Sequence, residues 1–160
     1  MKDATHAKLL DALRGRVWHA TSVECYKSIK ADGFIRVRPP RHQYQKSFCQ
    51  HSGRVSLFDF RDAPGLADAI DRGDWLGFLG GVPGGLVVFL GLDPSLPVIP
   101  AATLVAESND ARISGRLTGP QGSRLIADLE TGHLGDIPAH RIVEVFQWEP
   151  QTSILSHVPL

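Results

Sequence analysis

His19 and Thr21 lie where a short strand is expected to run directly into a helix. Residues 16–24 begin with an apolar strand pattern and continue into a helical one. Thr21 and Glu24 have the spacing of a capping box, in which the threonine caps the helix start. Backbone N–H groups stay free at such a start and can bind a polar ligand. His19 is therefore a candidate binding residue, although a half-buried strand histidine without a function fits the same pattern.

Glu130 is the second candidate. Residues 124–130 alternate in a way that predicts a strand, with Leu125, Ala127 and Leu129 on one face and Ile126, Asp128 and Glu130 on the other. Glu130 would then end this strand, directly before the glycine turn that starts at Thr131. A carboxylate in that place can line a cleft. A solvated strand end without a function is the simpler interpretation of the local sequence.

Two cysteines are too few for a disulfide framework and are typical of a reducing compartment. Cys25 could act as a nucleophile with His19 as its base, but a cysteine in the middle of a helix is more often a small buried hydrophobe. His42, Cys49 and His51 lie close together in the sequence. Their spacing matches no closed zinc site and a fourth ligand is missing, so we predict no metal.

Charge and hydropathy limit the class of protein. The 160 residues carry 17 Lys and Arg and 17 Asp and Glu, so general electrostatic binding to nucleic acid or an anionic membrane is not indicated. Residues 36–54 are nevertheless basic and contain no acidic residue; they include Arg36, Arg38, Arg41, Lys46 and Arg54. The longest apolar run has about eight residues, too short to span a membrane, and the N-terminus has no apolar signal core. We expect a soluble cytoplasmic protein without a membrane partner.

The periodicity predicts an α+β fold in one domain, 1–160. Helices are expected over 3–14, 22–31 and 62–72, the last with Asp62 as cap and Pro64 in its first turn, and a short helical turn over 139–141. Strands are expected over 17–21, 34–37, 54–60, 86–92, 104–106, 124–130 and 142–148, with loops over 41–53 and 108–123 and a turn over 132–138. The apolar run 86–92 is typical of a strand buried on both faces. Gly33 is expected to end the second helix in the left-handed conformation. Residues 75–82 have no clear pattern.

Together these features resemble the ADP-ribosyltransferase superfamily, in particular its DarT-like, DNA-modifying toxin branch and small uncharacterised bacterial proteins with the same pattern. The resemblance covers residues 16–146. It depends on the ordered set His19-Ala20-Thr21, then Asp32-Gly33-Phe34-Ile35, then the small and aromatic residues 55–61, and finally Glu130 followed by Ile137-Pro138 and the strand that starts at Ile142.

The resemblance implies a split, twisted pair of antiparallel β-sheets with short flanking helices and with NAD in the cleft between the sheets. By this resemblance, His19 would hydrogen-bond a ribose hydroxyl, Thr21 would help bind the dinucleotide, and Ser56 would stand near the place of the family's Ser-Thr-Ser motif. Phe58 or Phe60 would stack on nicotinamide, and Arg36, Arg38 and Arg54 would bind the pyrophosphate. Glu130 would accept a hydrogen bond from the 2′-hydroxyl of the nicotinamide ribose. Glu130 would also stabilise the positive charge that develops as nicotinamide leaves.

The sequence departs from the family pattern in three ways. A phenylalanine replaces the usual central tyrosine, the Ser-Thr-Ser motif is absent with only Ser56 near its place, and Asp128 stands where arginine-modifying members carry Glu or Gln. The predicted function is NAD-dependent ADP-ribosyl transfer to a macromolecular acceptor, protein or nucleic acid, or hydrolysis of NAD. Two alternatives remain: an RNA 2′-phosphotransferase on the same fold, whose basic residues would grip an RNA phosphate, and a non-catalytic protein-interaction domain.

Overall fold

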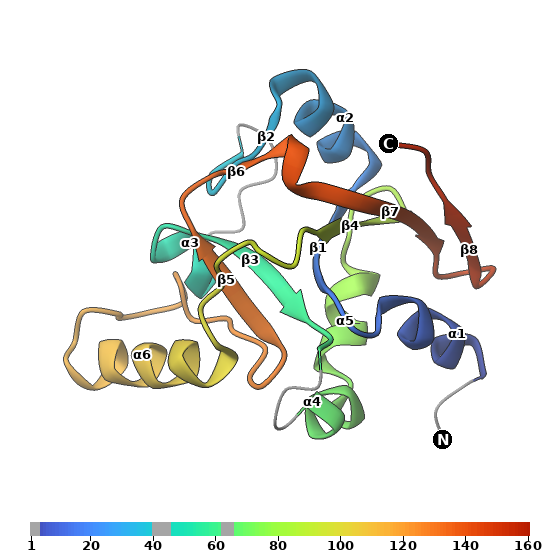
Figure 1. Cartoon of the computed structure of the whole chain (residues 1–160). Helices are drawn as coiled ribbons and strands as arrows, with labels where there is room; N and C mark the ends of the chain where they lie inside the picture. Colours follow the sequence, from blue (N-terminus) through green and yellow to red (C-terminus); the bar gives the residue numbers. More distant parts are fainter. Residues whose placement is uncertain (1–3, 40–45, 62–65) are drawn as a thin grey trace.

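The computed structural model describes residues 4–39, 46–61 and 66–160. Within them, a six-stranded sheet has the order β5-β3-β1-β4-β7-β8, and a second sheet pairs β2 with β6 (Figure 1). All neighbouring strands in both sheets are antiparallel, which confirms the α+β class. The strands are β1 (Val17–Ser22), β2 (Phe34–Ile35), β3 (Arg54–Asp59), β4 (Val87–Leu92), β5 (Glu130–Leu134), β6 (Ile137–Pro138), β7 (Ile142–Glu149) and β8 (Ile154–His157).

Helices cover both faces of the large sheet. They are α1 (Ala4–Leu13), α2 (Val23–Asp32), α3 (Phe48–His51), α4 (Leu66–Arg72), α5 (Asp74–Gly80), α6 (Ala101–Ile113) and the 3-10 turn η1 (Ala139–Arg141). The first two predicted helices and the turn 139–141 are confirmed to within about two residues. The predicted cap Asp62, the proline at 64 and the basic loop residues 40–45, with Arg41 and His42, lie outside the described residues. None of the helices described is long and apolar enough to cross a membrane.

Two apolar clusters sandwich the sheet. β4 shows the alternation: Val87 and Phe89 belong to the cluster under α1, α4 and α5, whereas Val88 and Leu90 belong to the cluster that α2 and β2 cover (Figure 1). All six residues of β4 are buried, so the predicted strand with two buried faces is confirmed. A third, smaller cluster beneath α6 contains Phe48, Cys49, Leu104 and Leu117.

Ser22, not Thr21, caps α2. Its hydroxyl accepts a hydrogen bond from the Cys25 amide at 3.1 Å. The predicted cap was wrong by one residue because β1 stays paired with β4 through Ser22, which delays the helix start to Val23. Gly33 ends α2 with φ of 83°, and its N–H donates to the Ile29 carbonyl at 2.8 Å, so the predicted left-handed stop is confirmed.

The predicted strand 104–106 and the first part of the predicted loop 108–123 are wrong, because residues 101–113 form α6; residues 114–123 have no regular structure, as predicted. Only Leu104 and Ser108 are buried along this helix. Since one of the two core-facing positions is a serine, the helix lacks the apolar stripe that normally reveals a helical period. α5 occupies most of the unassigned stretch 75–82, and β8 lies in the weakly patterned tail.

The predicted strand 124–130 is also wrong, because β5 starts at Glu130 and the preceding residues form a turn. The amides of Leu129 and Glu130 both donate to the Ile126 carbonyl, at 3.4 and 2.9 Å. Asp128 adopts a positive φ of 67° in this turn. Ile126 and Leu129 are buried in the same apolar cluster at a spacing of three, so the apparent alternation of faces was accidental. Residues 132–134, predicted as part of a turn, continue β5.

β1 separates from β3 after a very short contact. The two strands pair only at Val17–Asp59 and Trp18–Phe58, whereas β1 pairs with β4 over five residues, from Trp18 to Ser22. β3 and β5 therefore diverge from the β1-β4-β7-β8 part of the sheet beyond Trp18 (Figure 1). Their divergence leaves space between the two parts.

Candidate functional site

A cleft of about 750 Å³ occupies the space where β1 and β3 diverge. One wall comes from β1, α2 and the segment that follows β2; the other comes from β3, α3 and the turn before β5. The segment after α5 closes one end. A volume of this size lies in the usual range for small-molecule sites. The predicted site residues that line this cleft are His19, Thr21, Arg36, Arg38, Ser56, Phe58 and Glu130; Arg54 and Phe60 do not.

His19, on β1, bonds to β3 where the two strands separate. Its Nδ1 lies 2.9 Å from the backbone carbonyl oxygen of Ser56 on β3. Because a carbonyl can only accept, Nδ1 carries the hydrogen and Nε2 of the neutral ring is an acceptor. Burial lowers the pKa of His19 and the Ser56 carbonyl opposes this in part, so the ring is neutral near pH 7. A neutral Nε2 can accept a hydrogen bond from a ligand hydroxyl.

His19→Asn is expected to flatten the acid side of the stability profile. The pKa of His19 is below its ordinary value of 6.5 in the folded protein, so the unfolded chain binds the proton first as pH falls. Its contribution is complete above pH 6.5 and is lost as pH falls from 6.5 toward the lower folded pKa. Asparagine keeps a donor for Ser56 but cannot titrate. Urea unfolding from about pH 7.5 to about pH 5 should show a smaller loss in the variant.

One result would contradict this prediction, and the titration of one other group has to be separated from it. Parallel profiles for wild type and His19→Asn would show that His19 does not titrate abnormally. The pKa of Glu130 is raised by burial, so that carboxylate contributes the opposite slope, with stability rising as pH falls through its folded pKa toward 4.5. The difference between the two profiles removes this second contribution, because Glu130 is present in both proteins.

Glu130 presents a fixed carboxylate to the cleft. The side chain is 6% exposed, and the Ser56 hydroxyl donates to Oε1 at 2.6 Å while the Ile126 amide donates to Oε2 at 2.8 Å. Burial raises the pKa of Glu130; the bonds from Ser56, Ile126 and the Cys49 thiol and the charge of Arg124 oppose that rise. A carboxylate held in this way can accept a hydrogen bond from a ligand or stabilise a nearby positive charge without reorganising.

Cys49 does not have the setting of a nucleophile. Burial raises the pKa of the Cys49 thiol and the Glu130 carboxylate beside it adds to the rise, so Cys49 is protonated. Its Sγ donates to the Thr131 carbonyl at 3.7 Å. Cys25 lies in the first turn of α2, not in the middle of the helix as predicted, and lines the cleft. Among the residues described, no group of three or more His, Cys, Asp or Glu is placed to hold a metal ion.

Three phenylalanines line the cleft, and they differ in exposure: Phe34, Phe58 and Phe78. Phe58 lines the cleft but is only 2% exposed. Phe60 is equally buried, lies outside the cleft lining and packs against Trp75 with ring centroids 5.0 Å apart. Phe78 is half-buried, lines the cleft and contacts Phe58 at 5.2 Å between centroids. Phe34 also lines the cleft and is 37% exposed, but the Arg36 guanidinium lies over its ring at 4.6 Å from the centroid.

The three predicted anion-binding arginines have different surroundings. Arg36 is held by Asp32, with Nε and Nη2 bonds of 2.6 and 2.8 Å, and by Asp136 at 2.9 Å. Arg54 lies outside the cleft, where it forms an ion pair with Glu107 at 2.7 Å. Arg38 is exposed and lines the cleft. Two carboxylates therefore already balance the charge of Arg36.

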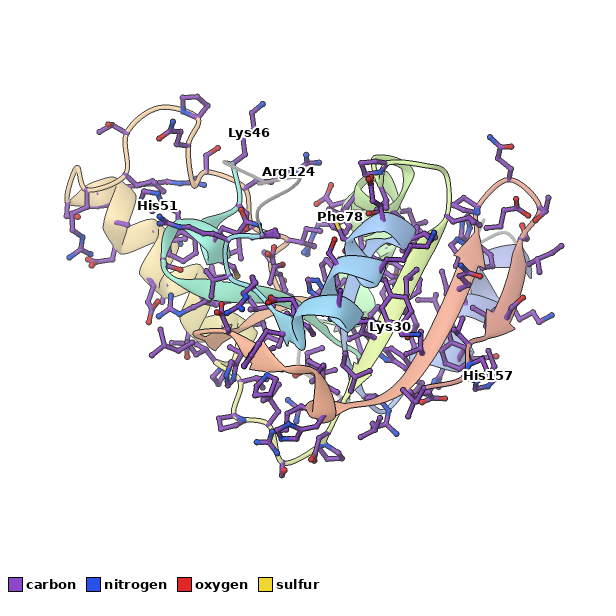
Figure 2. The ribbon with its side chains drawn as sticks, turned by 90° about the horizontal axis from the view of Figure 1, so that it is seen from above. Lys30, Lys46, His51, Phe78, Arg124 and His157 are labelled. Atoms are coloured by element: carbon purple, nitrogen blue, oxygen red, sulfur yellow. The ribbon has the colours of Figure 1, made fainter. Side chains whose placement is uncertain are left out.

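Arg124 is a cationic cleft residue that lies in the predicted strand 124–130. It forms a single bridge with Ser47, and its amide donates to the Lys46 carbonyl at 2.7 Å. The side chain is exposed and lines the cleft. Figure 2 shows Arg124 and Lys46 on one side of the opening and Phe78 on the other. Arg38 and Arg124 are the cleft arginines best placed to meet an anionic ligand.

No family model matches this sequence, and no curated protein matches it. Among solved structures the chain is similar to EcPltA, with 16% identity, 91% of this chain and 84% of that chain covered, and a TM-score of 0.44. A function must therefore be inferred from the cleft itself.

Sequence reasoning missed Phe78, Arg124 and the Ile126 amide. Phe78 lies in a stretch where Gly77 and Gly80 obscure the helical period. Arg124 and Ile126 were assigned to a strand that does not exist. A signal for the turn was present in Asp128, since aspartate tolerates the left-handed conformation better than most residues.

Proposed function

We propose that this protein is an NAD-dependent ADP-ribosyltransferase or NAD glycohydrolase. The observation that carries the proposal is the buried Glu130 carboxylate, held by Ser56 and Ile126 in one wall of a cleft whose other wall holds a neutral His19. Cleavage of the bond between nicotinamide and ribose develops positive charge on the ribose. A carboxylate fixed before the reaction is most valuable in that transition state.

The rest of the cleft supports a dinucleotide as the ligand. Its volume of about 750 Å³ suits a molecule of that size class. Arg38 and Arg124 supply positive charge for a pyrophosphate. In this proposal Phe78, and not Phe58 or Phe60, stacks on the nicotinamide ring, because the other two rings are almost fully buried. The divergence of β1 and β3 is compatible with the split sheets of the ADP-ribosyltransferase fold.

The reaction assigns a role to each polar group. Glu130 accepts a hydrogen bond from the 2′-hydroxyl of the nicotinamide ribose, and Nε2 of His19 accepts one from another ribose hydroxyl. The bond between C1′ and the nicotinamide nitrogen breaks, and its electron pair leaves with nicotinamide, which becomes neutral. A nucleophile of the acceptor, or water, then attacks C1′ and loses its proton. Thr21, on the His19 wall, helps seat the dinucleotide.

The test is NAD binding and nicotinamide release by the purified chain. Calorimetric titration measures binding, and chromatography measures release, with and without a mixture of protein and nucleic acid acceptors. Saturable binding with nicotinamide release supports the proposal. Absence of binding at millimolar NAD rejects it, and 2′-phosphorylated RNA would then be the next substrate to assay. Binding without release, also with acceptors present, would reject catalysis and leave a binding module.

A further inference from the structure

Arg72, at the end of α4, holds the turn that leads into Glu130. Its Nη2 donates to the Ala127 carbonyl at 2.7 Å and its Nη1 donates to the Asp128 carboxylate at 3.3 Å. The same turn supplies the Ile126 amide that donates to Oε2 of Glu130 at 2.8 Å. A guanidinium outside the cleft is thus connected, through one tight turn, to a carboxylate inside it.

Asp128 has a backbone conformation that needs such support. Its φ of 67° is uncommon for residues other than glycine, since the Cβ crowds the neighbouring carbonyl. Asp128 does not line the cleft, so its side chain is not placed to contact a ligand. Glycine would adopt this conformation without strain but would give Arg72 no carboxylate to bind. Aspartate at position 128 therefore accepts some backbone strain and provides the carboxylate that Arg72 binds.

We infer that Arg72 and Asp128 form a clamp that orients the Glu130 carboxylate by fixing the Ile126 amide. The inference rests on the proposed function, in which Glu130 acts on the nicotinamide ribose. Arg72 and Asp128 are positioning residues, since they act through the turn and not on the substrate. Without the clamp the turn relaxes, the Ile126 amide moves away from Oε2, and the carboxylate keeps the bond from the Ser56 hydroxyl.

Arg72→Ala is expected to lower kcat for nicotinamide release by about tenfold with little change in KM, because misplacement of a reacting group costs turnover more than binding. Asp128→Asn should stay close to wild type, since asparagine tolerates the left-handed conformation and keeps an oxygen for Arg72. Arg116→Ala is the matched control, because Arg116 forms an exposed pair with Asp110 at 2.6 Å and does not line the cleft. Thermal unfolding of each variant separates this effect from loss of fold.

A second readout does not need activity. The ¹³C resonance of the Glu130 side-chain carboxyl, assigned with the help of Glu130→Gln, reports its titration directly. The Ile126 bond lowers the pKa of Glu130, so Arg72→Ala should move the titration to higher pH, and Asp128→Asn and Arg116→Ala should leave it in place. The other groups near Glu130 that influence its titration are the Cys49 thiol, the Ser56 hydroxyl and Arg124, and none of them changes in these variants.

The two readouts separate the inference from the proposed function. A shifted titration in Arg72→Ala supports the clamp, even if wild type releases no nicotinamide and the enzymatic proposal fails. An unchanged titration overturns the clamp, whatever the turnover. A shifted titration in both Arg72→Ala and Arg116→Ala would also overturn it, because any loss of surface charge would then have the same effect.

Discussion

Glu130→Gln is expected to lower nicotinamide release by about 10²-fold or more, as for other losses of a pre-organised electrostatic group in an active site. Glutamine has nearly the same shape but no charge. Its single oxygen can accept from either Ser56 or Ile126, which donate to the two carboxylate oxygens of the wild type. The variant therefore keeps the packing of the site and loses the charge that stabilises the ribose cation. Initial rates of release at saturating NAD measure the effect.

The fold should tolerate this change. Burial raises the pKa of Glu130, so the charged form is costly to bury, and a neutral amide removes that cost while losing one hydrogen bond. Glu107→Gln is the control, because Glu107 is a half-exposed carboxylate that pairs with Arg54 outside the cleft. If Glu130→Gln released nicotinamide as fast as wild type, the assignment of Glu130 and the proposed reaction would both have to be abandoned.

Phe89→Ala is expected to lower the free energy of unfolding by about 3–5 kcal/mol. Phe89 is fully buried at the centre of β4, with Trp18 and Trp75 at 6.5 and 6.3 Å between ring centroids. Removing the ring leaves a cavity lined by large side chains that cannot close around it. A domain of this size is usually stable by only about 5–15 kcal/mol, so the loss is a large fraction of the total. Urea denaturation followed by tryptophan fluorescence measures it.

Ile113→Ala provides the comparison for Phe89→Ala. Ile113 is 87% exposed at the end of α6, so its truncation should change the free energy of unfolding by less than about 0.5 kcal/mol. A loss below about 1 kcal/mol for Phe89→Ala would contradict the buried position of this ring, because such values are typical of surface substitutions.

The central strands were predictable because their local patterns agree with their environment. β4 is a continuous apolar run and is buried on both faces. Along β3 and the residue that follows it, Val55 and Leu57 alternate with Phe58 and Phe60, and the two sets belong to different clusters. Gly33 ends α2 as its residue type predicts. In each case a period of two or a turn residue reports directly on burial or backbone angle.

Elements whose patterns contradict their environment were not predictable. α6 places Ser108 in a buried position, which removes the apolar period that would have identified it. Residues 124–129 copy the alternation of a strand, although Arg124 forms only a single bridge and the chain from Ile126 onward forms a turn closed by the Ile126 carbonyl. The error was possible because Ile126 and Leu129 are buried from a turn, and burial alone does not reveal backbone conformation.

The residues of the candidate site were predictable in part, but the contacts between them were not. His19 and Glu130 were selected from the sequence, and the structure places both in one cleft. The two acidic partners of Arg36 come from α2 and from the turn before β6, and the latter contact was not accessible from the sequence. The absence of Arg54 and Phe60 from the cleft lining likewise depends on how β3 is oriented where it separates from β1. Contacts between distant segments decide these points, and local spacing does not contain them.

The strand order has a consequence for how the protein forms during synthesis. β3, β1 and β4 are adjacent in the middle of the sheet, and all three are complete once Leu92 has been made. β5 and β7 attach later to the two outer sides of this trio. Chains emerge from the ribosome N-terminus first, so the middle of the sheet is available for pairing well before Glu130 exists. The histidine wall of the cleft and the β3 part of the opposite wall are therefore made early, and the turn that leads into Glu130 is added only when most of the chain has been translated.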